Sequence, residues 1–248
     1  MKKIAIISGA SSGIGRELAR GIAARGGADE LWLIARREER LRALAGELAC
    51  PARILPLDLL APNTAGVIAA ALAEEEGTTV SILVAAAGVG HTGAFIDGTA
   101  AEIEATIGLN CTAATTLLHT VLPHMRAGGR VLLLASAAAF APQPYFAVYA
   151  ASKAYLLSLS RALSVELRAR QITVTAVCPG PVDTEFFGEK GVDPRKRRYL
   201  ASPVRVARGA LKAAYRGRAV YTPTLAMRLC RLAAKLLPHG WLTRFFKQ

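Results

Sequence analysis

The chain has 248 residues and a mass of 26.1 kDa; 52% of its residues are hydrophobic, 20% are charged, and its mean hydropathy is +0.32. This composition excludes a largely disordered chain and is sufficient for one large core, so a single domain is expected. The 31 basic and 18 acidic residues give a net charge of +13, which favours anionic partners: phosphorylated cofactors, acidic substrates, nucleic acid or anionic membrane.

The four cysteines, Cys50, Cys111, Cys178 and Cys230, are too widely spaced for a metal cluster and lie in apolar sequence. Buried, reduced thiols in a cytoplasmic protein are therefore expected, with no metal site. The first residues break into Gly-Ala-Ser-Ser-Gly after a few apolar positions, too early for a secretory signal, and no apolar stretch approaches the roughly twenty residues of a membrane span.

Short β-rich runs alternate with longer helical patterns along the chain. The runs cover residues 4–8, 31–35, 54–58, 82–86, 131–136 and 172–178, and the helical patterns cover 13–25, 38–49, 63–75, 100–125 and 149–168. Nearly continuous apolar strands joined by helices predict an α/β fold of the Rossmann type, with a doubly wound parallel sheet and helices on both faces. Ligands of such sheets bind beyond the carboxyl ends of the strands, so functional residues are expected there.

A glycine-rich turn follows the first run and leads directly into a helix. It reads Gly9-Ala10-Ser11-Ser12-Gly13-Ile14-Gly15. Glycines let backbone N–H groups approach a pyrophosphate, and the start of the helix adds its positive end. We therefore expect nucleotide binding at this turn.

The second run ends in Arg36 and Arg37, where an NAD-selective site usually carries an acidic residue. The two guanidinium groups favour a ribose 2′-phosphate and hence NADP(H) over NAD(H). The alternative is that they only begin a helix with ordinary charge pairs.

Asp58 and Leu59 follow the third run, where the carboxylate could hold an adenine amino group or cap the next segment. The fourth run continues into small residues, including Ala87 and Gly88, which permit close approach of a cofactor.

The fifth run ends at Ser136, and Tyr149 and Lys153 follow on one face of a predicted helix. An ammonium beside a phenol should lower the phenol's pKa toward neutrality and make Tyr149 a general acid or base. Without the other motifs, Tyr149 could also be a half-buried aromatic residue of a helix, and Ser136 an ordinary small polar residue at the end of a strand.

Taken together, these motifs resemble the short-chain dehydrogenase/reductase superfamily, in its main single-domain group, over residues 3 to about 221. The motifs are Ser8-Gly9-x-x-x-Gly13-x-Gly15, Asp58, Ala87-Gly88, Asn110, Ser136, Tyr149-x-x-x-Lys153 and Pro179-Gly180-x-Val182-x-Thr184. The resemblance implies about seven strands, the last at 219–221, and a catalytic set of Asn110, Ser136, Tyr149 and Lys153.

The resemblance also implies a role for each residue. Tyr149 would exchange a proton with the substrate oxygen, which Ser136 would bind; Lys153 would hold the nicotinamide ribose, and Asn110 a water that links Lys153 to solvent. The cofactor would lie against Gly9, Ser11, Ser12, Gly13, Ile14, Gly15, Arg36, Arg37, Asp58, Leu59, Ala87, Gly88, Tyr149, Lys153, Pro179, Gly180, Val182 and Thr184.

Two positions depart from the family pattern. Ser8 stands where the family usually has Thr, and the hydroxyl is kept. Ala85-Ala86-Ala87-Gly88 replaces the usual Asn-Asn-Ala-Gly, so amide hydrogen bonds of the fourth strand are missing and lower sheet stability or cofactor affinity is expected.

The predicted substrate region is mostly apolar. Its candidate residues are Ser136, Phe140, Tyr145, Phe186 and Phe187, with a lid at residues 186–201. These residues favour a small lipophilic ketone, aldehyde or alcohol. The basic run Arg195-Lys196-Arg197-Arg198 leaves a second option, an acyl thioester with a phosphate-rich handle, or is a solvated run of charge.

The catalytic domain is expected to span residues 1–224, followed by a basic amphipathic helical extension at 225–248. In the extension Arg228, Arg231 and Lys235 are expected opposite leucines such as Leu229 and Leu232. It could lie on a membrane surface, or pack on its own domain or on a second subunit of a dimer or tetramer.

These observations predict an NADP(H)-dependent oxidoreductase, cytoplasmic and in one alternative peripheral to the membrane. The competing hypothesis is a nucleotide-binding regulator or membrane scaffold without turnover, against which the complete Ser, Tyr, Lys and Asn set argues. Nucleic-acid binding is not expected, because the basic residues are scattered and no nucleic-acid module accompanies them.

Overall fold

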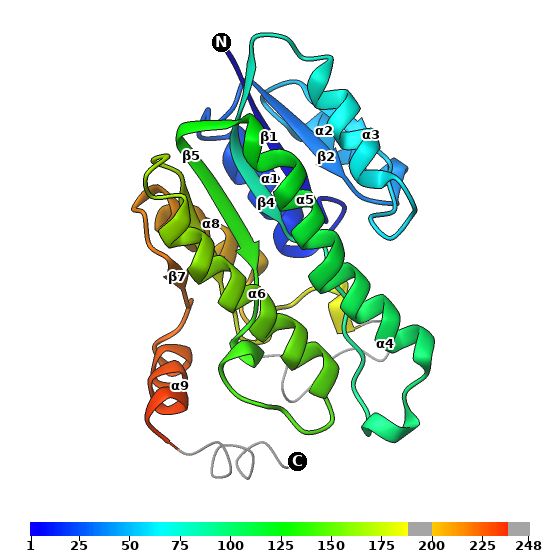
Figure 1. Ribbon diagram of the computed structural model, residues 1–248, viewed down its shortest axis with the longest axis vertical. Helices are drawn as coiled ribbons and strands as arrows, with labels where there is room; N and C mark the ends of the chain where they lie inside the picture. Colours follow the sequence, from blue (N-terminus) through cyan, green and yellow to red (C-terminus); the bar gives the residue numbers. More distant parts are fainter. Residues whose placement is uncertain (188–199, 238–248) are drawn as a thin grey trace.

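Seven parallel strands form one sheet in the part of the chain that the computed structural model describes, residues 1–187 and 200–237 (Figure 1). The strand order is β3-β2-β1-β4-β5-β6-β7. The strands are β1 (Lys2–Ser8), β2 (Glu30–Ile34), β3 (Ala52–Leu55), β4 (Thr78–Ala85), β5 (Met125–Leu134), β6 (Thr173–Val177) and β7 (Val220–Tyr221). The predicted doubly wound α/β fold is confirmed.

Helices cover both faces of the sheet because successive strand residues point to opposite sides. In β1, Ile4 and Ile6 belong to one core cluster, and Ala5 and Ile7 to the other. Helices α3 (Thr64–Ala73), α5 (Ala114–Val121) and α6 (Ala147–Glu166) cover the first face, and α1 (Gly13–Ala23), α2 (Glu38–Glu47) and α8 (Pro203–Tyr215) cover the second. Figure 1 shows α5 and α6 in front of the sheet and α1 and α8 behind it.

The helical pattern expected at 100–125 is not one continuous α-helix. It is divided into α4 (Ala100–Ile107), a π-helical turn (Gly108–Ala113), α5 and a 3-10 turn (Leu122–His124). A capping box starts α4: the Thr99 hydroxyl accepts from the backbone N–H of Glu102, whose carboxylate accepts from the backbone N–H of Thr99. Pro123 in the 3-10 turn ends the helical stretch, and Met125 already belongs to β5.

The third strand also lies earlier than the expected 54–58. Strand β3 is an edge strand, and its pairing with β2 stops at Leu55 opposite Ile34, the last residue of β2. The chain then turns toward the crevice above β1 and β4, where the strand order reverses.

Helix α9 (Leu225–Leu236) lies apart from the two layers, at the end of the molecule toward which β5 points (Figure 1). Its first turn is capped by the Thr224 hydroxyl, which accepts from the Met227 backbone N–H at 3.2 Å. No helix within the described residues has the length and apolar character required to cross a bilayer.

Candidate active site

A cavity of about 1090 Å³ opens at the carboxyl ends of the strands. It brings together every residue expected to contact the cofactor, from the glycine-rich turn through Arg36 and Asp58 to Lys153 and Thr184. Ser136, Phe140 and Phe186 of the expected substrate region line it too. Segments separated by more than a hundred residues therefore share one site, as expected for residues that follow the carboxyl ends of parallel strands.

The glycine-rich turn has no space for a side chain at Gly9 and little at Gly13. Gly9 and Gly13 adopt φ angles of +69° and +55°, which favour glycine, and a Cβ on Gly9 would lie 2.7 Å from the backbone nitrogen of Ala87. A Cβ on Gly13 would lie 3.1 Å from Thr184 Cγ2. The turn thus packs against the β4 loop on one side and the Thr184 loop on the other.

The Ser8 hydroxyl connects β1 to the end of β4. It donates to the Val84 carbonyl at 3.4 Å and accepts from the backbone N–H groups of Ala86 and Ala87 at 3.1 and 3.4 Å. The Ser8 side chain thereby holds the backbone of Ala86 and Ala87 in place. This is the position at which the side-chain amides of the family's usual asparagines are missing.

Two arginines after β2 line the cavity, as expected for binding of a phosphate. Arg37 pairs with Glu185 at 2.9 Å and donates to the Ser11 hydroxyl at 3.1 Å, and Arg40 joins Glu185 at 2.6 Å. These guanidinium groups hold the pKa of the Glu185 carboxyl below its usual value, chiefly through hydrogen bonds from Arg37 and then Arg40. Arg36 is exposed and makes no hydrogen bond or ion pair with the described residues.

Asp58 lines the cavity and also stabilises the turn that follows it, although the N-cap of α3 is Asn63. Its Oδ1 accepts from the backbone N–H of Leu60 at 2.9 Å, and its own carbonyl accepts from the Thr64 hydroxyl at 2.7 Å. The carboxylate therefore stabilises the turn before α3 with one oxygen and faces the cavity region beside Leu59.

The Tyr149 ring lies between two other aromatic rings. It stacks on Phe146 with centroids 4.2 Å apart and meets Phe186 at 5.3 Å in a tilted arrangement. Only 8% of Tyr149 is exposed. The two phenylalanines pack against the ring and limit its contact with water.

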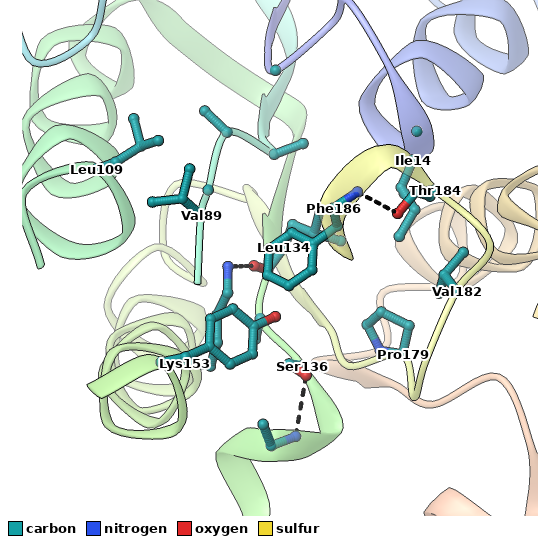
Figure 2. A pocket seen from close by; sticks show the side chains of 18 of the residues that line it. Ile14, Val89, Leu109, Leu134, Ser136, Lys153, Pro179, Val182, Thr184 and Phe186 are labelled. Carbon is teal, nitrogen blue, oxygen red and sulfur yellow. Dashed lines mark hydrogen bonds between the residues drawn. The ribbon is translucent and has the colours of Figure 1, made fainter. Parts of the chain in front are cut away.

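Lys153 is buried one helical turn beyond Tyr149. Its Nζ donates to the Leu134 carbonyl at 2.8 Å and lies 5.5 Å from the centroid of the Tyr149 ring (Figure 2). Burial lowers the pKa of this amine to about 8, although the nearby thiols of Cys111 and Cys178 act in the opposite direction.

The expected lowering of the Tyr149 pKa is wrong for this structure. Burial raises the pKa of the phenol to about 12, and the hydrogen bond with the Ser136 side chain offsets this only in part. The physical reason is that the ring is desolvated, while the Lys153 ammonium is directed to the Leu134 carbonyl. Tyr149 is thus protonated at neutral pH and equipped to donate.

Ser136 and Asn110 occupy different positions relative to the cavity. Ser136 lines it, and its hydroxyl accepts from the Ala138 N–H at 3.1 Å (Figure 2). Asn110, in the π-helical turn, is buried behind it: its amide bonds both backbone groups of Val89 at 2.8 and 2.9 Å and the Ser152 hydroxyl at 2.9 Å. Asn110 therefore holds the loop after β4.

One of the expected substrate residues does not have the expected position. Tyr145 does not line the cavity; its backbone has φ +61°, and its side chain is 56% exposed. The side chain of Phe187 and lid residues 188–199, including the basic run, lie outside the described residues, as do 238–248 of the extension.

The structure adds site residues that the sequence analysis missed. Phe146 could have been found from its i, i+3 spacing to Tyr149. One face of α9 also lines the cavity, through Met227, Cys230 and Ala234, and its spacing of 3 and 4 residues was the available signal. The cysteines were expected to be buried, but only Cys178 is; Cys230 is exposed.

Comparisons with known proteins find similarity over most of the chain. The family model described as short chain dehydrogenase matches residues 3–194. An uncharacterized oxidoreductase of Staphylococcus epidermidis is 30% identical over 196 residues, which cover 76% of this chain and 84% of the relative.

Solved structures extend the likeness over nearly the whole chain. A short-chain dehydrogenase from Sphingobium yanoikuyae in complex with NADPH has a TM-score of 0.82 at 33% identity, covering 97% of this chain and 95% of that one. The bulky-bulky ketone specific alcohol dehydrogenase from Comamonas testosteroni has a TM-score of 0.79 at 28% identity, covering 98% and 94%.

Proposed function

Since the chain belongs to the short-chain dehydrogenase/reductase family, and is thereby an oxidoreductase, we propose that it interconverts a lipophilic ketone or aldehyde and its alcohol with NADP(H). The observation that carries this proposal is the convergence of Tyr149, Ser136 and Lys153 on the wall of one large cavity. That cavity also contains the glycine-rich turn and Arg36.

The residues present fit a nicotinamide dinucleotide. The cavity, at about 1090 Å³, is slightly larger than the range of about 300–1,000 Å³ that is usual for small-molecule sites. Its glycine-rich turn precedes the N-terminus of α1, which favours a diphosphate. Lys153 Nζ uses one of its three N–H donors on Leu134, leaving the others for ribose hydroxyls. When bound, such a cofactor supplies or accepts the hydride.

The preference for NADP(H) is proposed from the charge after β2. Arg36 is unengaged within the described residues, and no carboxylate occupies the end of this strand. We expect Arg36→Asp to shift the ratio of NADPH to NADH efficiency toward NADH. An unchanged ratio would show that the phosphate is held elsewhere.

The proton step is assigned to Tyr149. Because burial raises its pKa to about 12, the phenol carries its proton at neutral pH and can give it to a carbonyl oxygen. That oxygen would be bound by the Ser136 hydroxyl, which lines the same wall. The protonated phenol favours the direction of reduction.

The proposed substrate class follows from the apolar wall around this group. Phe140, Phe146, Phe186 and Met227 line the cavity near Tyr149 and Ser136. A relative with the same fold is named for its specificity toward bulky-bulky ketones. A ketone with two large apolar substituents is the first candidate; acyl thioesters form the second group of the test panel.

The decisive experiment measures NADPH consumption by purified protein against ketosteroids, bulky aromatic ketones, 3-oxoacyl thioesters, quinones and simple aldehydes. We expect Tyr149→Phe to abolish turnover of the best substrate and leave NADPH affinity nearly unchanged. Tyr155→Phe is the matched control, because Tyr155 lies in the same helix, is 43% exposed and, among the described residues, forms a hydrogen bond only with Thr115.

Substantial activity of Tyr149→Phe would contradict the assignment. NADPH binding without oxidation across the whole panel would instead support the competing hypothesis of a regulator or scaffold.

The oligomeric state and the compartment are proposals too. We propose a cytoplasmic homo-oligomer, on the basis of four free cysteines and of exposed apolar residues of α6 such as Tyr155 and Val165, to be checked by light scattering.

A further inference from the structure

The positive charge of the chain is concentrated in its last part. Residues 1–193 contain 17 basic and 18 acidic residues, whereas residues 194–248 contain 14 basic residues and no acidic one. The net charge of +13 therefore comes entirely from the region that includes α8 and α9.

Helix α9 has an exposed apolar stripe in addition to the face that lines the cavity. Leu225, Leu229, Leu232 and Leu236 follow at spacings of 4, 3 and 4 and are 70%, 57%, 55% and 73% exposed. At 3.6 residues per turn they lie within an arc of about 60°. Exposed leucines in such a row are unusual for a surface helix, whose single apolar stripe normally faces the core.

The cationic residues of α9 lie directly beside this stripe. The same helical geometry places Arg228, Arg231 and Lys235 in a second arc roughly 100° from the leucines, adjacent to them and not opposite as the sequence analysis expected. Among the described residues none of these three has an acidic partner; Arg228 bonds the Thr222 carbonyl at 3.4 Å.

We propose that the leucine stripe of α9 docks on an anionic membrane surface. The leucines would enter the boundary between headgroups and acyl chains, and the adjacent cations would meet lipid phosphates. A second copy of the chain is a less suitable partner for the stripe. Two antiparallel α9 helices that pack through their leucines would bring their cationic residues to the same side, and α9 has no acidic residue to offset this repulsion. Nucleic acid would leave the leucines uncovered.

The docked helix would also form a wall of the cavity, because Met227, Cys230 and Ala234 lie on its other side. This consequence rests on the proposed function: a lipophilic carbonyl compound dissolved in the bilayer would have a short path to Tyr149. Docking itself does not depend on turnover, so it is tested by binding alone.

The test is flotation of the full chain with vesicles of phosphatidylcholine alone and with vesicles in which about one third of the lipid is phosphatidylglycerol. Binding to the anionic vesicles is expected, with weakening as salt is raised. The double variant Leu229→Gln/Leu232→Gln should lower the partition coefficient on the order of a hundredfold. Gln retains high helix propensity, and circular dichroism confirms folding.

Matched controls separate this face from a general effect of polarity or charge. Val67→Gln replaces a 43% exposed apolar residue of α3 and should leave binding unchanged. The double variant Arg228→Gln/Lys235→Gln should weaken vesicle binding roughly thirtyfold. The double variant Arg161→Gln/Arg168→Gln removes the same charge from another part of the chain and should weaken vesicle binding much less.

Absence of binding to anionic vesicles would overturn the proposal, and so would binding that the leucine variant leaves intact. A shift from dimer to monomer in the leucine variant, without vesicle binding by the wild type, would assign the stripe to a second copy. None of these outcomes depends on whether the protein oxidises NADPH.

Discussion

Gly90 provides a direct test of how tightly the phenol of Tyr149, the proposed proton donor, is positioned. A Cβ at this residue would lie 2.9 Å from Cγ and still closer to Cδ2 of Tyr149, and 3.1 Å from Cε2 of Phe146. Ordinary contacts begin near 3.4 Å, so the Tyr149 ring must move by at least 0.5 Å, and by more at Cδ2. Phe146 is stacked on the Tyr149 ring with centroids 4.2 Å apart, so the two rings must shift together or lose their contact.

A misplacement of about 1 Å in a catalytic group costs on the order of a hundredfold in rate. We therefore expect Gly90→Ala to lower kcat by roughly that factor and to cost about 1–3 kcal/mol of unfolding free energy through overpacking. NADPH affinity should change less than kcat, because Gly90 is not among the described residues that line the cavity.

Steady-state kinetics with the best carbonyl substrate, fluorescence titration of NADPH and urea unfolding measure the three quantities. Gly98→Ala is the control, since its Cβ would meet only the Phe95 carbonyl, at an ordinary 3.5 Å. A Gly90→Ala protein with wild-type kcat and stability would refute the argument that this glycine sets the ring position.

Three further predictions concern other parts of the site. Ser8→Ala removes the buried hydroxyl that accepts from Ala86 and should lower the urea unfolding free energy by about 1–3 kcal/mol; no loss would show that these N–H groups find other partners. Lys153 loses its proton near pH 8 in the folded protein and at 10.5 when unfolded, so the unfolded chain binds more protons in this window and stability rises with pH. The difference in unfolding free energy between wild type and Lys153→Met should therefore increase by about 1.4 kcal/mol per pH unit from pH 8 to 10, and parallel pH profiles would contradict the buried amine. Glu185→Gln should free Arg37 and tighten NADPH binding several-fold, with little effect on NADH; equal effects on both would exclude competition with a 2′-phosphate.

The sequence predicted most of the sheet and most of the residues that line the cavity, because both depend on local patterns. Buried parallel strands read as apolar runs, and the glycine turn, Arg36 and Asp58 follow those runs directly. Their convergence then follows from topology alone, since all carboxyl ends of a parallel sheet lie at one edge.

The remaining features depend on contacts between distant segments. The direction of the Tyr149 pKa shift could not be predicted, because it is set by burial between Phe146 and Phe186 and by the hydrogen bond of Lys153 to Leu134. Tyr145 was misplaced because its positive φ turns the chain just before α6. The cavity face of α9 was missed because its leucine stripe dominated the pattern.

The π-helical turn at Gly108–Ala113 makes the length of this segment critical. A π turn holds one more residue than an α turn, and each residue in a helix adds about 100° of rotation. With the extra residue, Asn110 reaches Val89 while Leu117 and Val121 of α5 still face the sheet. Loss of one amino acid here would rotate α4 relative to α5 by about 100°. A chain shortened by one residue at this position would therefore lose either the hydrogen bonds of Asn110 to Val89 or the packing of α5 against the sheet.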